Sequence, residues 1–155
     1  MRQTILNTII SDIRRISKDN NYNHDAPQAS AYYSKLDDVS IAPQINLYCG
    51  SEHSTPVEAG LESILKINIF THIQVNTDVK KEGLLTNEVE SWVNDFKLFF
   101  TEPSCAGSDV SKISTLWSVA GVTYYFISAV EPYYDRNDNR HTIFLELTVN
   151  YILIS

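Results

Sequence analysis

The chain has 155 residues, the length of one ordinary domain, and 43% of them are hydrophobic while 20% are charged. This composition is typical of a folded globular protein and excludes a disordered chain or a coiled coil. The 12 Lys and Arg are outnumbered by 19 Asp and Glu, so the net charge is −7. Because an acidic chain gains nothing from counterion release at DNA phosphates, a protein that grips nucleic acid is not expected.

The chain begins with helical periodicity. Ile5, Ile9, Ile13 and Ile16 fall on one stripe, which predicts an amphipathic helix over Arg2–Lys18. The segment lacks the continuous apolar core of a signal peptide, and no run approaches the length of a membrane span. We therefore expect a soluble protein that is made in a cytoplasm.

Later stretches have the alternation of strands that are buried on one face. These stretches are Ala29–Leu36, Ile45–Cys49, Leu61–Val75, Val119–Tyr133 and Thr142–Ile154. The polar run Asp135–Asn139 predicts a hairpin tip between the last two strands. Strands this long are expected to carry bulges or to project beyond the core, and Gly121 and Pro132 are candidate irregular positions.

A second amphipathic helix is predicted over Asn87–Phe100, with Asn87 and Glu90 placed as in a capping box. Its apolar stripe comprises Val89, Trp92, Val93, Phe96 and Phe100, widened by Leu98 and Phe99. The predicted fold class is α+β. It is a two-layer α/β sandwich of one domain, residues 1–155, in which two helices pack on one face of a mostly antiparallel sheet of about four to five strands. The intervening segments Gly50–Gly60, Asn76–Gly83 and Thr101–Lys112 are expected to be long loops available for binding.

No motif indicates chemistry. The chain has no nucleophile elbow and no Gly-rich phosphate loop, and its four histidines are scattered. Cys49 and Cys105 lack the spacing of metal ligands, and we expect two ordinary buried thiols. The sequence therefore predicts no catalytic residue, no metal and no cofactor. A small hydrolase that uses Ser51, His53 or Asp25 is a remote alternative.

Aromatic residues occur in consecutive groups, at Tyr32–Tyr33, Tyr124–Phe126 and Tyr133–Tyr134. Neighbouring strand residues point to opposite faces, so each group places at least one ring on the face away from the helices. A protein partner would bury such rings, although isolated surface tyrosines need no partner.

The order of these segments resembles bacteriophage minor tail proteins of the tail-terminator type. The segments that carry the resemblance are Thr4–Ile10 with Ile13 and Ile16, Asn21–Asp25, Ala42–Tyr48, the strand Leu61–Val75, the helix Asn87–Phe100 and the closing strands that end in Phe144–Tyr151. They extend over nearly the whole chain.

The resemblance implies a structural virion protein and not an enzyme. Such proteins form a ring, usually a hexamer, which caps the tail tube, ends its polymerisation and provides the head-to-tail joining surface. The implied partners are further copies of the chain, the tail tube protein and the head–tail connector protein, while DNA passes through the lumen without specific binding. The implied location is the head-proximal end of the tail, after assembly in the host cytoplasm. Another head–tail connector, neck or tail adaptor protein is the alternative.

A ring needs two different surfaces that complement each other on neighbouring subunits. We expect one of them on the sheet face away from the helices and at the hairpin tip. The expected interface residues are Phe70, Tyr125, Ile127, Tyr133, Tyr134, Phe144, Ile152 and Ile154. The long loops are expected to contact the tube and the connector.

Overall fold

The structure is a computed structural model that describes residues 1–31, 43–74, 82–106, 109–135 and 140–154, with the backbone alone at 74, 82–86, 105, 106, 133–135, 140 and 154. Its helices are α1 (Arg2–Asp12), α2 (Glu82–Phe99) and α3 (Pro103–Ala106), with the 3-10 turns η1 (Ile13–Arg15), η2 (Lys18–Asn20) and η3 (Thr115–Ser118). The strands are β1 (Ser30–Ala31), β2 (Gln44–Val57), β3 (Gly60–Gln74), β4 (Val122–Asp135) and β5 (Arg140–Ile154).

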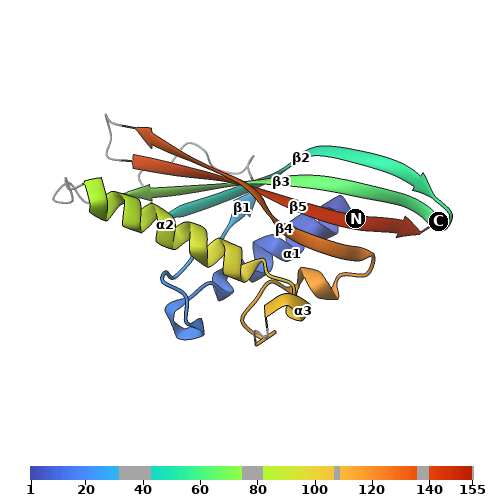
Figure 1. Cartoon of the computed structure of the whole chain (residues 1–155), viewed down its shortest axis with the longest axis horizontal. Helices are drawn as coiled ribbons and strands as arrows, with labels where there is room; N and C mark the ends of the chain where they lie inside the picture. Colours follow the sequence, from blue (N-terminus) through green and yellow to red (C-terminus); the bar gives the residue numbers. More distant parts are fainter. Residues whose placement is uncertain (32–42, 75–81, 107–108, 136–139, 155) are drawn as a thin grey trace.

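The five strands form one sheet in the order β1-β2-β3-β5-β4. The short β1 runs parallel to β2, and every other neighbouring pair is antiparallel. Helices α1 and α2 lie on the same side of this sheet (Figure 1). The predicted α+β class, with two helices packed on a mostly antiparallel sheet, is confirmed.

The core lies between the helices and the sheet face with alternating apolar residues. On β3, Leu65, Ile67 and Ile69 are fully buried, and their neighbours on β5 include Leu145 and Leu147. Residues directly opposite each other on antiparallel strands share a face, so these pairs form continuous apolar rows. The predicted alternation of both strands is confirmed.

The two helical stripes cover those rows. The four isoleucines that begin at Ile5 are 0% exposed, and Val89, Trp92, Val93 and Phe96 of α2 are all buried. Leu98 departs from the prediction because it is 56% exposed and does not widen the stripe. Its neighbours Phe99 and Phe100 are buried and form a T-shaped ring pair with centroids 5.0 Å apart.

Several predicted boundaries were wrong. Helix α2 begins at Glu82, so Asn87 lies inside the helix and does not cap it. An asparagine inside a helix lowers helix stability only modestly, so its place there is not unusual. Residues Gly50 to Val57 continue β2, and Val57 pairs with Gly60, so the expected loop is the end of a β2–β3 hairpin. Most of the expected loop Asn76–Gly83 and of the expected strand Ala29–Leu36 lies outside the described residues.

The strands are much longer than the helices that cover them. With 18 residues α2 is about 27 Å long, whereas β3 and β5, with 15 residues each, are about 50 Å long. The sheet therefore extends beyond its helical cover. The end of the β2–β3 hairpin projects past the helices in Figure 1.

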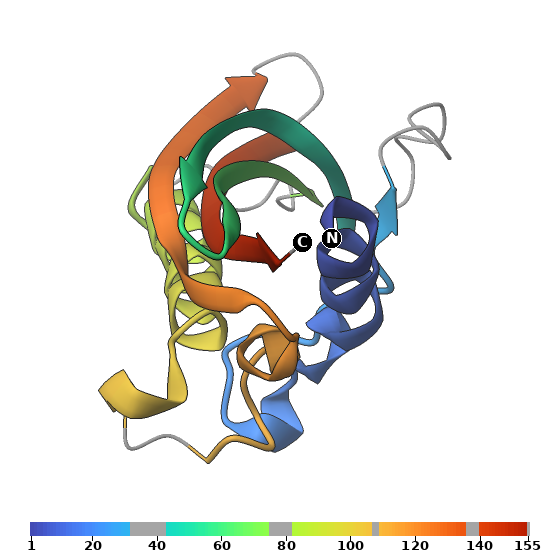
Figure 2. The ribbon, with the colours of Figure 1, turned by 90° about the vertical axis from the view of Figure 1, so that its right-hand side faces the viewer.

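Bulges bend the strands. The register shifts between Cys49 and Glu52 in β2, and twice in β4, between Val122 and Tyr124 and between Ile127 and Ala129. Such extra residues increase local twist and curvature, and the strands are strongly curved in Figure 2.

At two of these irregular positions the backbone lies close to a neighbouring strand, and a glycine fits there without a clash. A Cβ at Gly50 would lie 2.6 Å from Asn68 Nδ2. Gly121 has a φ of 92°, and a Cβ there would lie 2.7 Å from the Ile152 carbonyl oxygen. The candidate Gly121 thus lies just before the first shift in β4. Pro132 pairs regularly with Ile143, as a proline can on an edge strand.

A buried carboxylate joins the end of α1 to η3. Asp12 Oδ2 accepts hydrogen bonds from the Thr115 N–H at 2.7 Å, from Thr115 Oγ1 at 2.9 Å and from Ser114 Oγ at 3.1 Å. Burial raises the pKa of Asp12 above its ordinary value, and the hydrogen bonds from Thr115 and Ser114 oppose that rise. The side chain therefore binds a proton more readily in the folded than in the unfolded state.

Replacing Trp92 should strongly destabilise the protein. Trp92 is 3% exposed and stacks on His24 with centroids 4.1 Å apart. We expect Trp92→Ala to lower the free energy of unfolding by about 3–5 kcal/mol in urea titrations, because it leaves a cavity. Leu98→Ala, on the exposed side of the same helix, is the control and should cost much less. A Trp92→Ala variant that melts within a degree of the parent would show that Trp92 is not part of the core.

Asp12 should make stability fall as pH rises. A carboxyl group with a raised folded-state pKa stabilises most below its unfolded pKa of about 3.9, and this contribution is lost as pH rises through the folded-state value. In urea titrations across that range, Asp12→Asn should therefore gain stability relative to the parent.

Asp109→Asn is the control of opposite sign. Hydrogen bonds from the Ser111 side chain and backbone lower the pKa of the exposed Asp109. If the free energies of unfolding of the parent and of Asp12→Asn changed in parallel with pH, the raised pKa of Asp12 would be contradicted.

Candidate functional site: the open edge of β4

Strand β4 lies at one edge of the sheet. Its 14 residues pair with β5 on one side only, and no strand of the described part of the chain pairs with its other side. At the opposite edge, β1 pairs only with Asn46 and Leu47, so β2 is open from Tyr48 to Val57 within the same described residues. Unpaired edges carry free N–H and C=O groups that can add a further strand.

Exposed apolar side chains gather at the β4 edge. Tyr124 is 39% exposed, Phe126 is 49% exposed and Val130 is 36% exposed. Trp117 of η3 is 45% exposed, and both η3 and α2 contact β4. We call these four residues the β4 edge surface. Grouped exposed side chains of this kind indicate an interaction site, whereas single ones do not.

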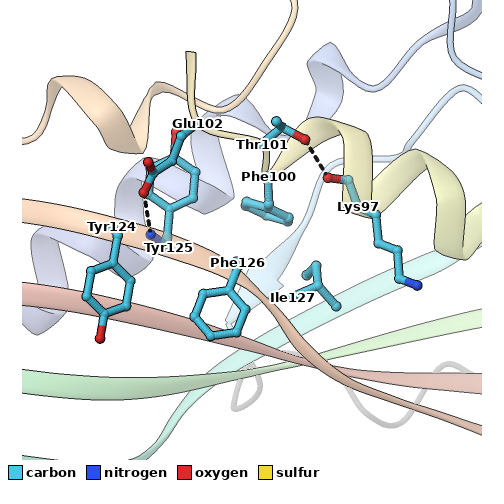
Figure 3. Close-up of a pocket in the computed structure, with 8 residues that line it drawn as sticks. All are labelled: Lys97, Phe100, Thr101, Glu102, Tyr124, Tyr125, Phe126 and Ile127. Atoms are coloured by element: carbon cyan, nitrogen blue, oxygen red, sulfur yellow. Dashed lines mark hydrogen bonds between the residues drawn. The ribbon is translucent and has the colours of Figure 1, made fainter. Parts of the chain in front are cut away.

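A hollow of ≈ 420 Å³ lies between the end of α2 and β4 (Figure 3). Its lining residues are Lys97, Phe100, Thr101, Glu102, Tyr124, Tyr125, Phe126 and Ile127. A second hollow of ≈ 220 Å³ continues past Glu102 and Tyr125 to Trp117. Lys97 is exposed, and its ammonium group forms no ion pair with any described residue. The hollow is thus lined by four aromatic rings and by two opposite charges, those of Lys97 and Glu102.

Glu102 protects part of this edge. Its Oε1 accepts a hydrogen bond of 3.2 Å from the Tyr125 N–H, a bond that is drawn in Figure 3. The Tyr125 N–H is therefore already hydrogen-bonded and is not available to pair with a further strand. A charged group at a strand edge hinders indiscriminate pairing.

Two of the expected interface residues lie on the other face of the sheet. Tyr125 is 3% exposed and belongs to the core, and burial, followed by the nearby Glu102 charge, raises its pKa to about 12. Ile127 is half-buried against the same core. The reason is the register: Tyr125 pairs with Val149 and Ile127 with Leu147, both of which are buried core residues. The bulges in β4 change the alternation that the sequence pattern implied.

Other expected interface residues do lie on the face away from the helices. Phe70 pairs with Phe144, and Ile152 pairs with Glu62. All three of these apolar side chains are half-buried. The side chains of Tyr133, Tyr134 and Ile154 lie outside the described residues.

That face combines an aromatic cluster with a polar network. The Phe70 ring lies 5.1 Å from Phe144 and 5.6 Å from Tyr48, measured between centroids. Beside them, Lys66 Nζ donates to Thr148 Oγ1 at 2.7 Å and lies 3.4 Å from Glu146 Oε1. Phe126 pairs with Thr148 and so belongs to the same face. Tyr124 and Phe126 of the β4 edge surface therefore adjoin the face on which an interface was expected, whereas Val130, which pairs with the core residue Leu145, lies on the helix side.

The structure assembles no catalytic group from the residues of the hydrolase alternative. Ser51 and His53 are exposed on the outer part of β2. Asp25 lines a hollow of ≈ 270 Å³ together with His24 and Trp92, and that lining includes neither Ser51 nor His53. Asp25 Oδ1 accepts a hydrogen bond of 2.8 Å from the Lys18 N–H. Cys49 is a half-buried free thiol, not fully buried as expected, and the Cys105 side chain lies outside the described residues.

Among the described residues, no group of three or more His, Cys, Asp or Glu side chains is placed to hold a metal ion. Within the same part of the chain, no helix has the length and apolarity needed to cross a membrane. No protein-family model matches the chain, and no curated protein sequence matches it significantly.

The sequence pattern missed Leu98, Trp117 and Val130 as exposed residues. Leu98 fits a helical stripe, and Trp117 follows no strand pattern, so neither carried a signal of exposure. One signal was present in Pro132, because a proline within a strand marks an edge position.

The exposed aromatic side chains should contribute little to stability. Phe126→Ser should change the free energy of unfolding by no more than about 0.5 kcal/mol, since the side chain is half exposed and outside the core. The measurement is a urea titration of dilute protein. Phe96→Ala, a fully buried ring, is the control and should cost about 3–5 kcal/mol. Similar losses in both variants would mean that Phe126 serves the fold and not an interface.

Proposed function

We propose that this chain is a structural protein of a tailed bacteriophage that forms a ring on the tail tube, ends tube growth and offers a joining surface for the head. The observation that supports this most is the open β4 edge with its exposed aromatic residues on a sheet that extends beyond its helices. A monomer gains nothing from such a surface, whereas a ring buries it between subunits.

The charge supports the same role. The chain carries a net charge of −7, and a ring of such subunits repels DNA phosphates. DNA can then slide through the lumen without being held. The proposed partners are the tail tube protein and the head–tail connector protein, and the proposed location is the head-proximal end of the tail.

The proposed subunit contact begins at the β4 edge surface and extends onto the sheet face that carries Phe70, Phe144 and Ile152. These residues lie on one face with Phe126. The proposal also includes the strand ends with Tyr133, Tyr134 and Ile154. Ile127 lies in the lining of the hollow beside this edge.

A charge at Phe144 should give a folded subunit that no longer assembles. An unpaired charge in an interface costs several kcal/mol, so Phe144→Asp should remain a monomer at concentrations at which the parent forms rings. Light scattering after size exclusion measures the mass, and circular dichroism checks the fold. Electron microscopy of the parent with purified tail tubes should show it at the tube end.

Asn94→Asp is the control, because it adds the same charge at an exposed position of α2, away from that sheet face, and should assemble like the parent. Rings and capped tubes from Phe144→Asp would show that the sheet face is not part of the contact. A parent protein that stays monomeric and ignores tail tubes would contradict the proposed function.

A further inference from the structure

Most of the exposed large apolar side chains among the described residues fall into two groups, one at the β4 edge and one at the end of the β2–β3 hairpin. One is the β4 edge surface. The other lies at the end of the β2–β3 hairpin, where Val57 is 37% exposed and Leu153 of the adjoining β5 is 49% exposed. We call Pro56, Val57, Glu58 and Ala59 the hairpin tip, and all four are exposed. Two separate patches on one subunit are what a head-to-tail contact between copies requires.

The two patches have complementary chemistry. The hollow beside β4 is lined by four aromatic side chains, by Glu102, which is hydrogen-bonded to the Tyr125 N–H, and by the exposed Lys97, which forms no ion pair with a described residue. The hairpin tip presents the apolar Val57 next to the negative Glu58. An apolar residue can thus enter the aromatic hollow while the opposite charges approach each other.

The register places both patches toward the same end of the sheet, with Val57 four residues further out along β2 than His53, the residue level with Tyr124. Tyr124 pairs with Asn150, Asn150 with Ile64, and Ile64 with His53. Tyr124 therefore lies level with the outer part of the hairpin, but three strands away. Strands β2 and β4 form the two ends of the strand order apart from the short β1, so the edge that carries the tip and the edge that carries the hollow are different edges of one subunit.

Strand directions agree with this contact. Successive pairs from β2 through β3 and β5 to β4 are all antiparallel, so β4 runs opposite to β2. A neighbouring copy with the same strand direction would bring its open β2 edge antiparallel to β4. Antiparallel pairing is the geometry of most of this sheet, and it satisfies edge N–H and C=O groups.

We infer that the hairpin tip of a second copy of this chain occupies the hollow between α2 and β4. Val57 enters the aromatic hollow, and Glu58 approaches Lys97. This inference rests on the proposed ring and specifies the contact between its subunits. Each subunit gives its tip to one neighbour and receives the tip of the other.

The test uses two variants that each destroy one patch. Val57→Asp places a charge on the tip, and Phe126→Asp places one in the hollow; both positions are exposed, so both variants should fold. In sedimentation velocity each variant alone should associate about a hundredfold more weakly than the parent. An equal mixture should form dimers, because the intact tip of one variant meets the intact hollow of the other.

Val110→Asp is the matched control, since Val110 is 44% exposed but belongs to neither patch. It should assemble like the parent. A Val57→Asp variant that assembles normally while Phe126→Asp does not would overturn this inference and leave the ring proposal intact, as the β4 edge would then meet a different surface of the neighbouring subunit. A mixture that stays monomeric would also overturn it. A monomeric parent would contradict the ring proposal itself.

Discussion

The structure depends on the mismatch in length between a sheet and the helices that cover it. Strands β3 and β5 extend about 50 Å, whereas α2 covers about 27 Å. One face is apolar along the covered length and packs against Ile9, Trp92 and Phe96. In the outer part of β2 the strand turns polar, from Ser51 to Thr55. The hairpin end projects because no helix of the described chain lies under it.

The same arrangement leaves β4 as a long edge strand. Pro132 and the Glu102 carboxylate are features by which proteins limit uncontrolled edge pairing. Yet Tyr124, Phe126 and Val130 remain exposed along this strand. An edge that is guarded at one N–H but apolar along its side chains is suited to one specific partner. The hollow beside it supplies the shape that such a partner must match.

Much of the fold could be predicted from side-chain periodicity. The stripe from Ile5 to Ile16 and the alternation from Leu65 to Ile73 each specify one buried face, and the structure confirms both. The boundaries were less accurate, because polar residues in the outer part of β2 resemble a loop when pairing with β3 is not known. The faces in β4 could not be predicted, since two bulges change the alternation and bring Tyr125 into the core.

The central claim is that β4 is buried between subunits, and hydrogen exchange of its backbone amides tests it most directly. The protein is labelled in deuterated buffer at a dilution where it is monomeric and at a concentration where it assembles. The account predicts that the outer amides of Val122–Asp135 exchange rapidly in the monomer and slowly in the assembly, while β3 is protected in both. Assembly that leaves β4 exchange unchanged would contradict the account, because the subunits would then meet elsewhere.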